Sequence, residues 1–149
     1  MIASICPGVG QDAQCGFVII VQDSGLSLYF TGEGPYDGQD DALVGVLNLS
    51  SNAVHSLNLS SDQDIMGFDG DGLTTYVIQG GNGRKVPGNA SDQTGYGGPN
   101  AYYSNINAAN TAGAVNFITP IAANNGTAYF ALENTLTAAT TCLTGSAVK

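Results

Sequence analysis

Short runs of β-prone residues, separated by turn signals at close spacing, constrain this chain more than any other feature. The runs are rich in Val, Ile, Leu, Phe and Tyr and are bounded by Gly, Asn, Asp and Ser. Such segments predict strands, and no segment has a convincing helical period. About eight strands in one chain of 149 residues predict an all-β, single-domain, two-sheet sandwich with Ig-like, Greek-key connections. A closed barrel is the alternative.

The turn signals mark where the expected strands begin and end. Residues 17–22 and 26–31 flank Asp23-Ser24-Gly25 and predict a β-hairpin, and residues 42–48 and 53–59 predict a second one. Further strands are expected at 73–78, 101–106, 114–119 and 127–133.

The remaining segments define the expected domain limits. We expect an irregular segment over 1–14, the sandwich over 15–142 and a flexible tail over 143–149. Residues 79–100 form a long Gly-rich loop, and loops of that length are usually functional.

The charge balance excludes several classes of partner. The chain has twelve acidic and three basic residues and a net charge of −9. No basic patch can displace counterions from nucleic acid or bind an anionic membrane. The longest apolar run, residues 17–21, is far shorter than the roughly 20 residues that span a bilayer. This composition is typical of an extracellular or cell-surface protein, and we expect that a signal peptide has been removed.

Three cysteines, Cys6, Cys15 and Cys142, allow one disulfide and leave one thiol. A metal site is disfavoured because the chain has no C-x-x-C pair and one histidine. Cys6–Cys15 would close a short loop, whereas Cys15–Cys142 would join the two ends of the domain. We favour Cys15–Cys142, formed in an oxidising compartment.

Two short stretches hold eight of the twelve acidic residues: Glu33, Asp37, Asp40 and Asp41, then Asp62, Asp64, Asp69 and Asp71. Crowded carboxylates repel one another unless a cation or solvent screens them. Gly-rich acidic loops offer the carboxylate and carbonyl oxygens that Ca²⁺ prefers, although neither stretch has EF-hand spacing. The alternative is a pair of solvated turns, because Asp-Gly is also a common turn signal.

Catalysis has weaker support. Glu133 ends an apolar strand, where it could bind calcium, face water, or pair with an Asp in a glycosidase. His55, the one histidine, is expected on the polar face of a strand, and no Ser lies in a G-x-S-x-G elbow. The Gly-rich segment at residues 80–85 lacks the spacing of a phosphate-binding loop. We therefore assign no catalytic residue.

Tyrosines suggest another kind of site. Tyr96, Tyr102 and Tyr103 lie in or beside the Gly-rich loop, where aromatic faces could stack on sugar rings. The alternative is that they pack beneath the long loops as part of the core.

Four motifs resemble a known group of proteins. They are GPYDGQDDALVGV at residues 34–46, GFDGDG at 67–72, TGYGGP at 94–99 and GTAYFALE at 126–133. In this order they are similar to secreted bacterial β-rich domains, which often occur in exported proteins with PEP-CTERM-like or other surface anchors. The resemblance implies a location and a fold but no reaction.

Taken with the acidic loops, the resemblance implies that separate loops converge at one end of a sandwich and share one calcium ion. The expected ligands are Asp37, Asp40, Asp41, Asp69, Asp71 and Glu133. The expected function is a non-enzymatic, calcium-stabilised sandwich in adhesion, extracellular matrix or filament and surface assembly. Its partner would be another copy of itself or an extracellular polysaccharide. A carbohydrate-binding module is the alternative, followed by an extracellular glycan hydrolase.

Overall fold

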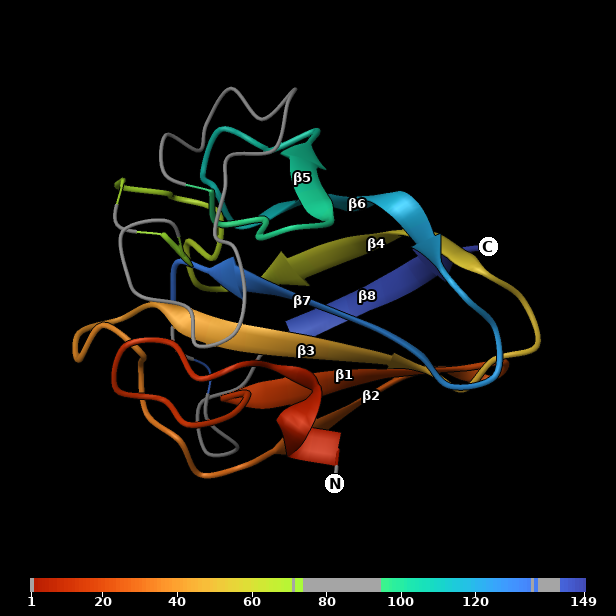
Figure 1. Cartoon of the computed structure of the whole chain (residues 1–149). Helices are drawn as coiled ribbons and strands as arrows, with labels where there is room; N and C mark the ends of the chain where they lie inside the picture. The colour runs from red at the N-terminus through yellow and green to blue at the C-terminus, as the bar shows by residue number, and fades with distance from the viewer. Residues whose placement is uncertain (1, 71, 74–94, 135, 137–142) are drawn as a thin grey trace.

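Two four-stranded sheets form the fold of this computed structural model (Figure 1). The structure describes residues 2–70, 72–73, 95–134, 136 and 143–149. Apart from a short 3₁₀ helix, η1 (Ile2–Ile5), the regular elements in this part of the chain are strands. The predicted all-β, two-sheet sandwich is confirmed.

The first sheet has the strand order β2-β1-β3-β7. Its strands are β1 (Phe17–Gln22), β2 (Gly25–Phe30), β3 (Ala42–Asn48) and β7 (Gly126–Leu132). β1 and β2 form the predicted hairpin. β3 runs parallel to β1 and antiparallel to β7, so it is a central strand. Six of its seven residues are buried, as its almost wholly apolar sequence requires.

The second sheet has the strand order β5-β6-β4-β8 and is antiparallel throughout. Its strands are β4 (Val54–Ser61), β5 (Ala101–Ser104), β6 (Ala112–Ile121) and β8 (Leu143–Val148). β4 buries Val54, Leu57 and Leu59 and exposes His55, as predicted. An irregularity in its pairing with β6 between Val54 and Ser56 lets Val54 and Leu57, three positions apart, both face the core. The core lies between the two inner faces.

The predicted second hairpin is wrong, because β3 and β4 belong to different sheets. The turn between them is present, but it carries the chain from one sheet to the other. The buried Asn48 amide makes this crossing possible by donating to the carbonyls of Asn52, Ile121 and Ala122 at 2.9–3.1 Å. Its Oδ1 accepts the N–H and O–H of Ser50. Asn48 thereby ties the turn after β3 to the end of β6 in the second sheet.

Two further predictions need correction. Residues 143–148 form β8, not a flexible tail, because they pair with residues 56–61 of β4. Cys15 forms its disulfide with Cys6, so the Cys15–Cys142 pairing is wrong. Cys142 lies outside the described residues, as do most of the strand expected at 73–78 and of the loop at 79–100.

The disulfide belongs to a tightly bonded N-terminal segment. Val9 and Asp12 exchange backbone hydrogen bonds at 2.9 Å, and the Gly16 N–H donates to the Leu43 carbonyl at 2.7 Å. The segment expected to be irregular, residues 1–14, is described from residue 2 onward, and this part packs onto the first sheet through η1 and a disulfide-closed loop. In the part of the chain that is described, no helix has the length and apolar character needed to cross a membrane.

Candidate metal centre

The β2–β3 loop is built around the carboxylate of Asp37. Its Oδ1 accepts the backbone N–H groups of Gln39, Asp40 and Asp41 at 2.9–3.1 Å. Gly38 has φ +77°, which glycine adopts without strain, and so the chain can turn back over Asp37. Asp37-Gly38-Gln39 thus forms an Asx-type turn, the arrangement typical of Asp at the start of a tight loop.

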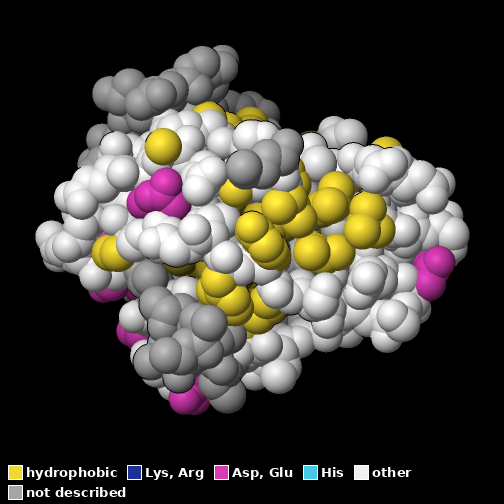
Figure 2. Space-filling model, turned by 90° about the horizontal axis from the view of Figure 1, so that it is seen from below, with side chains coloured by type: hydrophobic (Ala, Val, Ile, Leu, Met, Phe, Trp, Pro, Cys, Tyr) yellow, Lys and Arg dark blue, Asp and Glu magenta, His cyan; other side chains and the backbone are white. Residues whose placement is uncertain are grey.

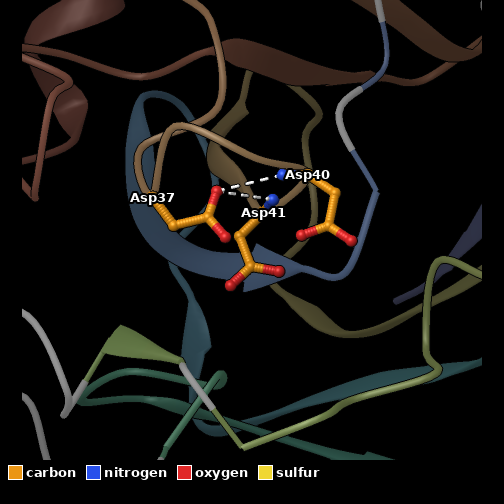
Figure 3. Close-up of side chains that lie close together, drawn as sticks. All are labelled: Asp37, Asp40 and Asp41. Atoms are coloured by element: carbon orange, nitrogen blue, oxygen red, sulfur yellow. Dashed lines mark hydrogen bonds between the residues drawn. The ribbon is translucent and has the colours of Figure 1, made fainter.

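This turn brings three carboxylates together (Figure 3). Asp37, Asp40 and Asp41 each offer an oxygen, and these oxygens lie within 4.8 Å of one another. Asp41 is fully buried and the other two are half-buried. Since Oδ1 of Asp37 is occupied by N–H donors, Oδ2 is the oxygen that a ligand could take, and it has no hydrogen-bond partner in the structure as described.

Two tyrosine hydroxyls donate hydrogen bonds to the carboxylate of Asp41. Tyr36 and Tyr96 each place their hydroxyl oxygen near Oδ2 of Asp41, at 3.2 and 3.3 Å. The hydroxyl oxygen of Tyr96 also lies 3.0 Å from Oδ1 of Asp69. Tyr96 therefore connects the two acidic loops that were expected to share one cation.

The other predicted ligands are placed as follows. Asp69 is exposed and reaches Asp41 through Tyr96. Glu133 is buried and directly follows β7. Leu132 at the end of β7 pairs with Ala42 at the start of β3, so Glu133 and Asp41 each lie one residue beyond this last pair. Within the described residues, neither Asp69 nor Glu133 belongs to the group of oxygens gathered within 4.8 Å. Asp71 lies outside the described residues.

Asp12, which the sequence did not single out, also belongs to this end of the molecule. It is 3% exposed, and its Oδ2 has no hydrogen-bond partner in the described chain. Burial, together with the nearby carboxylates of Glu33 and Asp37, raises the pKa of Asp12 to about 7. One sequence signal could have found it: Asp12 lies between Cys6 and Cys15, whose disulfide orders an otherwise irregular segment.

The tyrosines expected to bind sugars are mostly part of the core. Tyr96 and Tyr103 are 0% and 3% exposed, and each packs against Phe68 with ring centroids 4.5 Å apart. Tyr102 is half-buried. The expectation of an exposed stacking face is therefore wrong for Tyr96 and Tyr103, because a sugar ring cannot reach a buried aromatic face.

The carboxylates of this cluster are of a kind that could hold a hard cation. Carboxylate oxygens are preferred ligands of Ca²⁺ and Mg²⁺, and a bound cation reduces the repulsion between carboxylates that lie close together.

His55, the one histidine of the chain, lies on the exposed face of β4, as the sequence predicts.

Hydrophobic side chains form a second surface feature. A groove with a volume of about 230 Å³ lies where the edge strands β2 and β8 approach each other. Its apolar lining residues are Ile19, Leu26, Leu28, Leu59 and Leu143. Hydrophobic side chains gather on the face seen from below in Figure 2, the side on which Figure 1 places β1 and β2.

No protein-family model, curated protein or solved structure matches this chain.

Proposed function

We propose that this protein is an extracellular, non-enzymatic β-sandwich that Ca²⁺ stabilises, with a role in adhesion, matrix or surface assembly. The observation that carries the proposal is the carboxylate cluster, in which the oxygens of Asp37, Asp40 and Asp41 lie within 4.8 Å. The Cys6–Cys15 disulfide supports an oxidising compartment.

Calcium is the cation that suits this cluster best. A Ca²⁺ ion takes six to eight oxygen ligands in a flexible geometry, which suits an irregular loop and carboxylates from several segments. Asp69 and Glu133 lie at the same end of the sandwich, where they could add charge or water-mediated ligands. In this proposal Glu133 is a neighbour of the cation and not a catalytic acid.

The test uses tyrosine as a built-in probe. The chain has no Trp, and the hydroxyls of Tyr36 and Tyr96 lie beside Asp41. Tb³⁺ bound at the cluster should therefore emit when tyrosine is excited, and Ca²⁺ should displace it. Ca²⁺ should also raise the melting temperature above that in excess EDTA, because it binds the folded state.

Two variants make the test specific. Asp40→Asn should lose most of the Tb³⁺ emission and of the Ca²⁺-dependent rise in melting temperature. Asp62→Asn removes the same charge from an exposed position outside the cluster and should keep both. The proposal would be wrong if Ca²⁺ left the melting temperature of the unmodified protein unchanged and mass spectrometry found no bound metal.

A variant of this function, assembly of identical copies, is favoured by the groove between β2 and β8. Both are edge strands, and neither contains a charged residue. Natural sheets usually protect their edges with Lys or Pro, and an edge without them can pair with another chain. We infer that the partner is a second copy of this protein, seated along this edge.

Light scattering and electron microscopy with added Ca²⁺ test the assembly. Leu26→Lys places a charge in the groove and should shift the protein toward the monomer. Ile118→Lys is the control, because Ile118 is 49% exposed on β6, away from the groove. A monomeric protein at every concentration, or equal assembly of both variants, would contradict this idea.

A further inference from the structure

The disulfide-closed N-terminal loop lies directly against the β2–β3 loop. The N–H of Gln11 donates to the carbonyl of Tyr36 at 2.8 Å. The Gln11 side chain also covers Gly38, where a Cβ atom would come within 2.4 Å of it. These contacts set Asp12, the next residue, beside the loop that carries the acidic cluster. Among the described residues, the group of oxygens within 4.8 Å of one another is that of Asp37, Asp40 and Asp41, so Asp12 would have to move toward it to share a cation with it.

Two carboxylate oxygens in this contact have no hydrogen donor among the described residues. They are Oδ2 of Asp12 and Oδ2 of Asp37, and both atoms are shielded from solvent. Asp12 as a whole is 3% exposed. A buried carboxylate oxygen without a donor is costly, and buried charges in proteins are normally paired or bound to a metal.

The contact between the two loops also brings their carboxylates to the same place. The N–H of Gln11, the neighbour of Asp12, bonds to the carbonyl of Tyr36, the neighbour of Asp37. Carboxylates brought together in this way repel one another unless a positive charge lies between them. A cation bound beside Asp37 would supply that charge.

We propose that Asp12 is a ligand of the cation held by Asp37, Asp40 and Asp41, so that one Ca²⁺ ion joins the N-terminal loop to the β2–β3 loop. This inference rests on the proposed calcium site and extends it to a fourth carboxylate, from a different segment. A bound cation would offset the free-energy cost of burying the Asp12 carboxylate. It also gives the Cys6–Cys15 disulfide a role, because the bond closes the loop that presents Asp12.

Calorimetric Ca²⁺ titration of three proteins tests the proposal: the unmodified chain, Asp12→Asn and Asp62→Asn. Asp12→Asn keeps the shape of the side chain and removes its charge. We expect it to bind Ca²⁺ at least about tenfold more weakly, since ligand charge sets the affinity of calcium sites. Asp62→Asn should bind as the unmodified chain does. Equal affinity of the two variants would overturn the role of Asp12.

The outcomes separate this inference from the proposed function. If the unmodified chain binds neither Ca²⁺ nor Tb³⁺, the calcium site itself fails, and the role of Asp12 fails with it. If all three proteins bind alike, the calcium site stands and the role of Asp12 alone is refuted.

If Asp12→Asn does not fold, nuclear magnetic resonance of the unmodified chain tests whether Asp12 binds the cation. Ca²⁺ should shift the side-chain carboxyl ¹³C resonance of Asp12 together with those of Asp37 and Asp41. A shift of the latter two without a shift of Asp12 would overturn the proposal.

Discussion

Asp12 combines burial with a carboxyl group and two acidic neighbours. Water is a far better solvent for a carboxylate than a protein interior, so such a group either takes up a proton or binds a cation. Without a cation the proton is favoured, which is why the pKa of Asp12 rises to about 7. With a cation the carboxylate is favoured. Proton and cation therefore compete for the same oxygen.

The first prediction concerns this carboxyl group in the cation-free protein. Its pKa is about 7 when folded and near 3.8 when unfolded. Between about pH 4 and 7 the folded state therefore holds a proton that the unfolded state has lost, and the stability from Asp12 falls as pH rises through this window. The loss should be about 2–4 kcal/mol, since one pKa unit corresponds to about 1.4 kcal/mol.

Urea unfolding in EDTA between pH 4 and 7 measures this loss. Asp12→Asn cannot ionise, so the difference in unfolding free energy between it and the unmodified chain isolates the contribution of Asp12 from that of other carboxylates. The two proteins should diverge steadily as pH rises. If the unfolding free energies of the two proteins changed in parallel across this pH range, the raised pKa of Asp12 would be contradicted.

Among the elements, β3 organises the sandwich. It pairs with strands on both sides and is covered by the N-terminal segment, and its first residue follows Asp41 directly. The rigid strand thus fixes one end of the acidic loop. At its other end, Asn48 directs the chain into the second sheet. A change anywhere along β3 should therefore affect stability more than a change in an edge strand.

Gly45 in the middle of β3 gives the second prediction. A Cβ atom there would lie 2.6 Å from the Sγ of Cys15 and 3.3–3.4 Å from the side chains of Ile5 and Val18. Gly45→Ala should cost about 1–3 kcal/mol, the usual price of overpacking a core. Gly34→Ala is the matched control, because no atom lies within 4 Å of its Cβ position. Equal unfolding free energies for the two variants would show that the N-terminal segment does not pack as described.

Asn48 gives the third prediction. Asn48→Ala removes the amide that serves three carbonyls and the oxygen that serves Ser50. Because these backbone groups are largely buried, the loss should be about 2–4 kcal/mol in urea unfolding. Asn58→Ala, on the exposed face of β4, should lose far less. Similar losses in the two variants would mean that water replaces the Asn48 bonds.

For the molecule as a whole, the uneven placement of charge is the main electrostatic feature. The acidic cluster lies at the end that holds the β2–β3 loop, whereas the Lys149–Asp23 ion pair, at 3.7 Å, lies at the other end (Figure 1). With a net charge of −9, repulsion is concentrated at one end of the sandwich.

The fourth prediction follows from this repulsion. Sodium chloride should raise the melting temperature of the EDTA-treated protein, because ions screen charges more than about 10 Å apart at 0.1 M. The rise should be smaller in saturating Ca²⁺, which neutralises part of the cluster directly. Scanning calorimetry across a salt series measures both slopes, and identical slopes would argue against a cation in the cluster.

The local features were predictable from the sequence because they depend on neighbours in the chain. The β1–β2 hairpin follows from its turn, and the alternation of Leu57, Asn58 and Leu59 in β4 follows from the two-residue period of a strand. The gathering of Asp37, Asp40 and Asp41 is equally local, since one Asx-type turn produces it. These features need no knowledge of distant contacts.

Other features depend on which distant segments meet, and there sequence patterns were insufficient. The parallel pairing of β3 with β1 and the Cys6–Cys15 bond each had a plausible rival along the chain. Tyr96 looks the same in sequence whether it is exposed or, as here, buried against Phe68. Residues 143–148 are too polar to predict a strand, and they form one because β4 offers an open edge.

The sequence alone accounts for the β character of the chain, most of its turns and its acidic loop, because all three arise from residues a few positions apart. Tertiary structure selected the strand pairing, the disulfide and the burial of Tyr96, and it placed Asp12 beside the β2–β3 loop. These outcomes depend on contacts between segments far apart in the chain, whose energies reflect shape and burial and leave no local pattern. The proposed cation site is divided in the same way: one turn gathers three carboxylates, and the fold supplies Asp12, the proposed fourth.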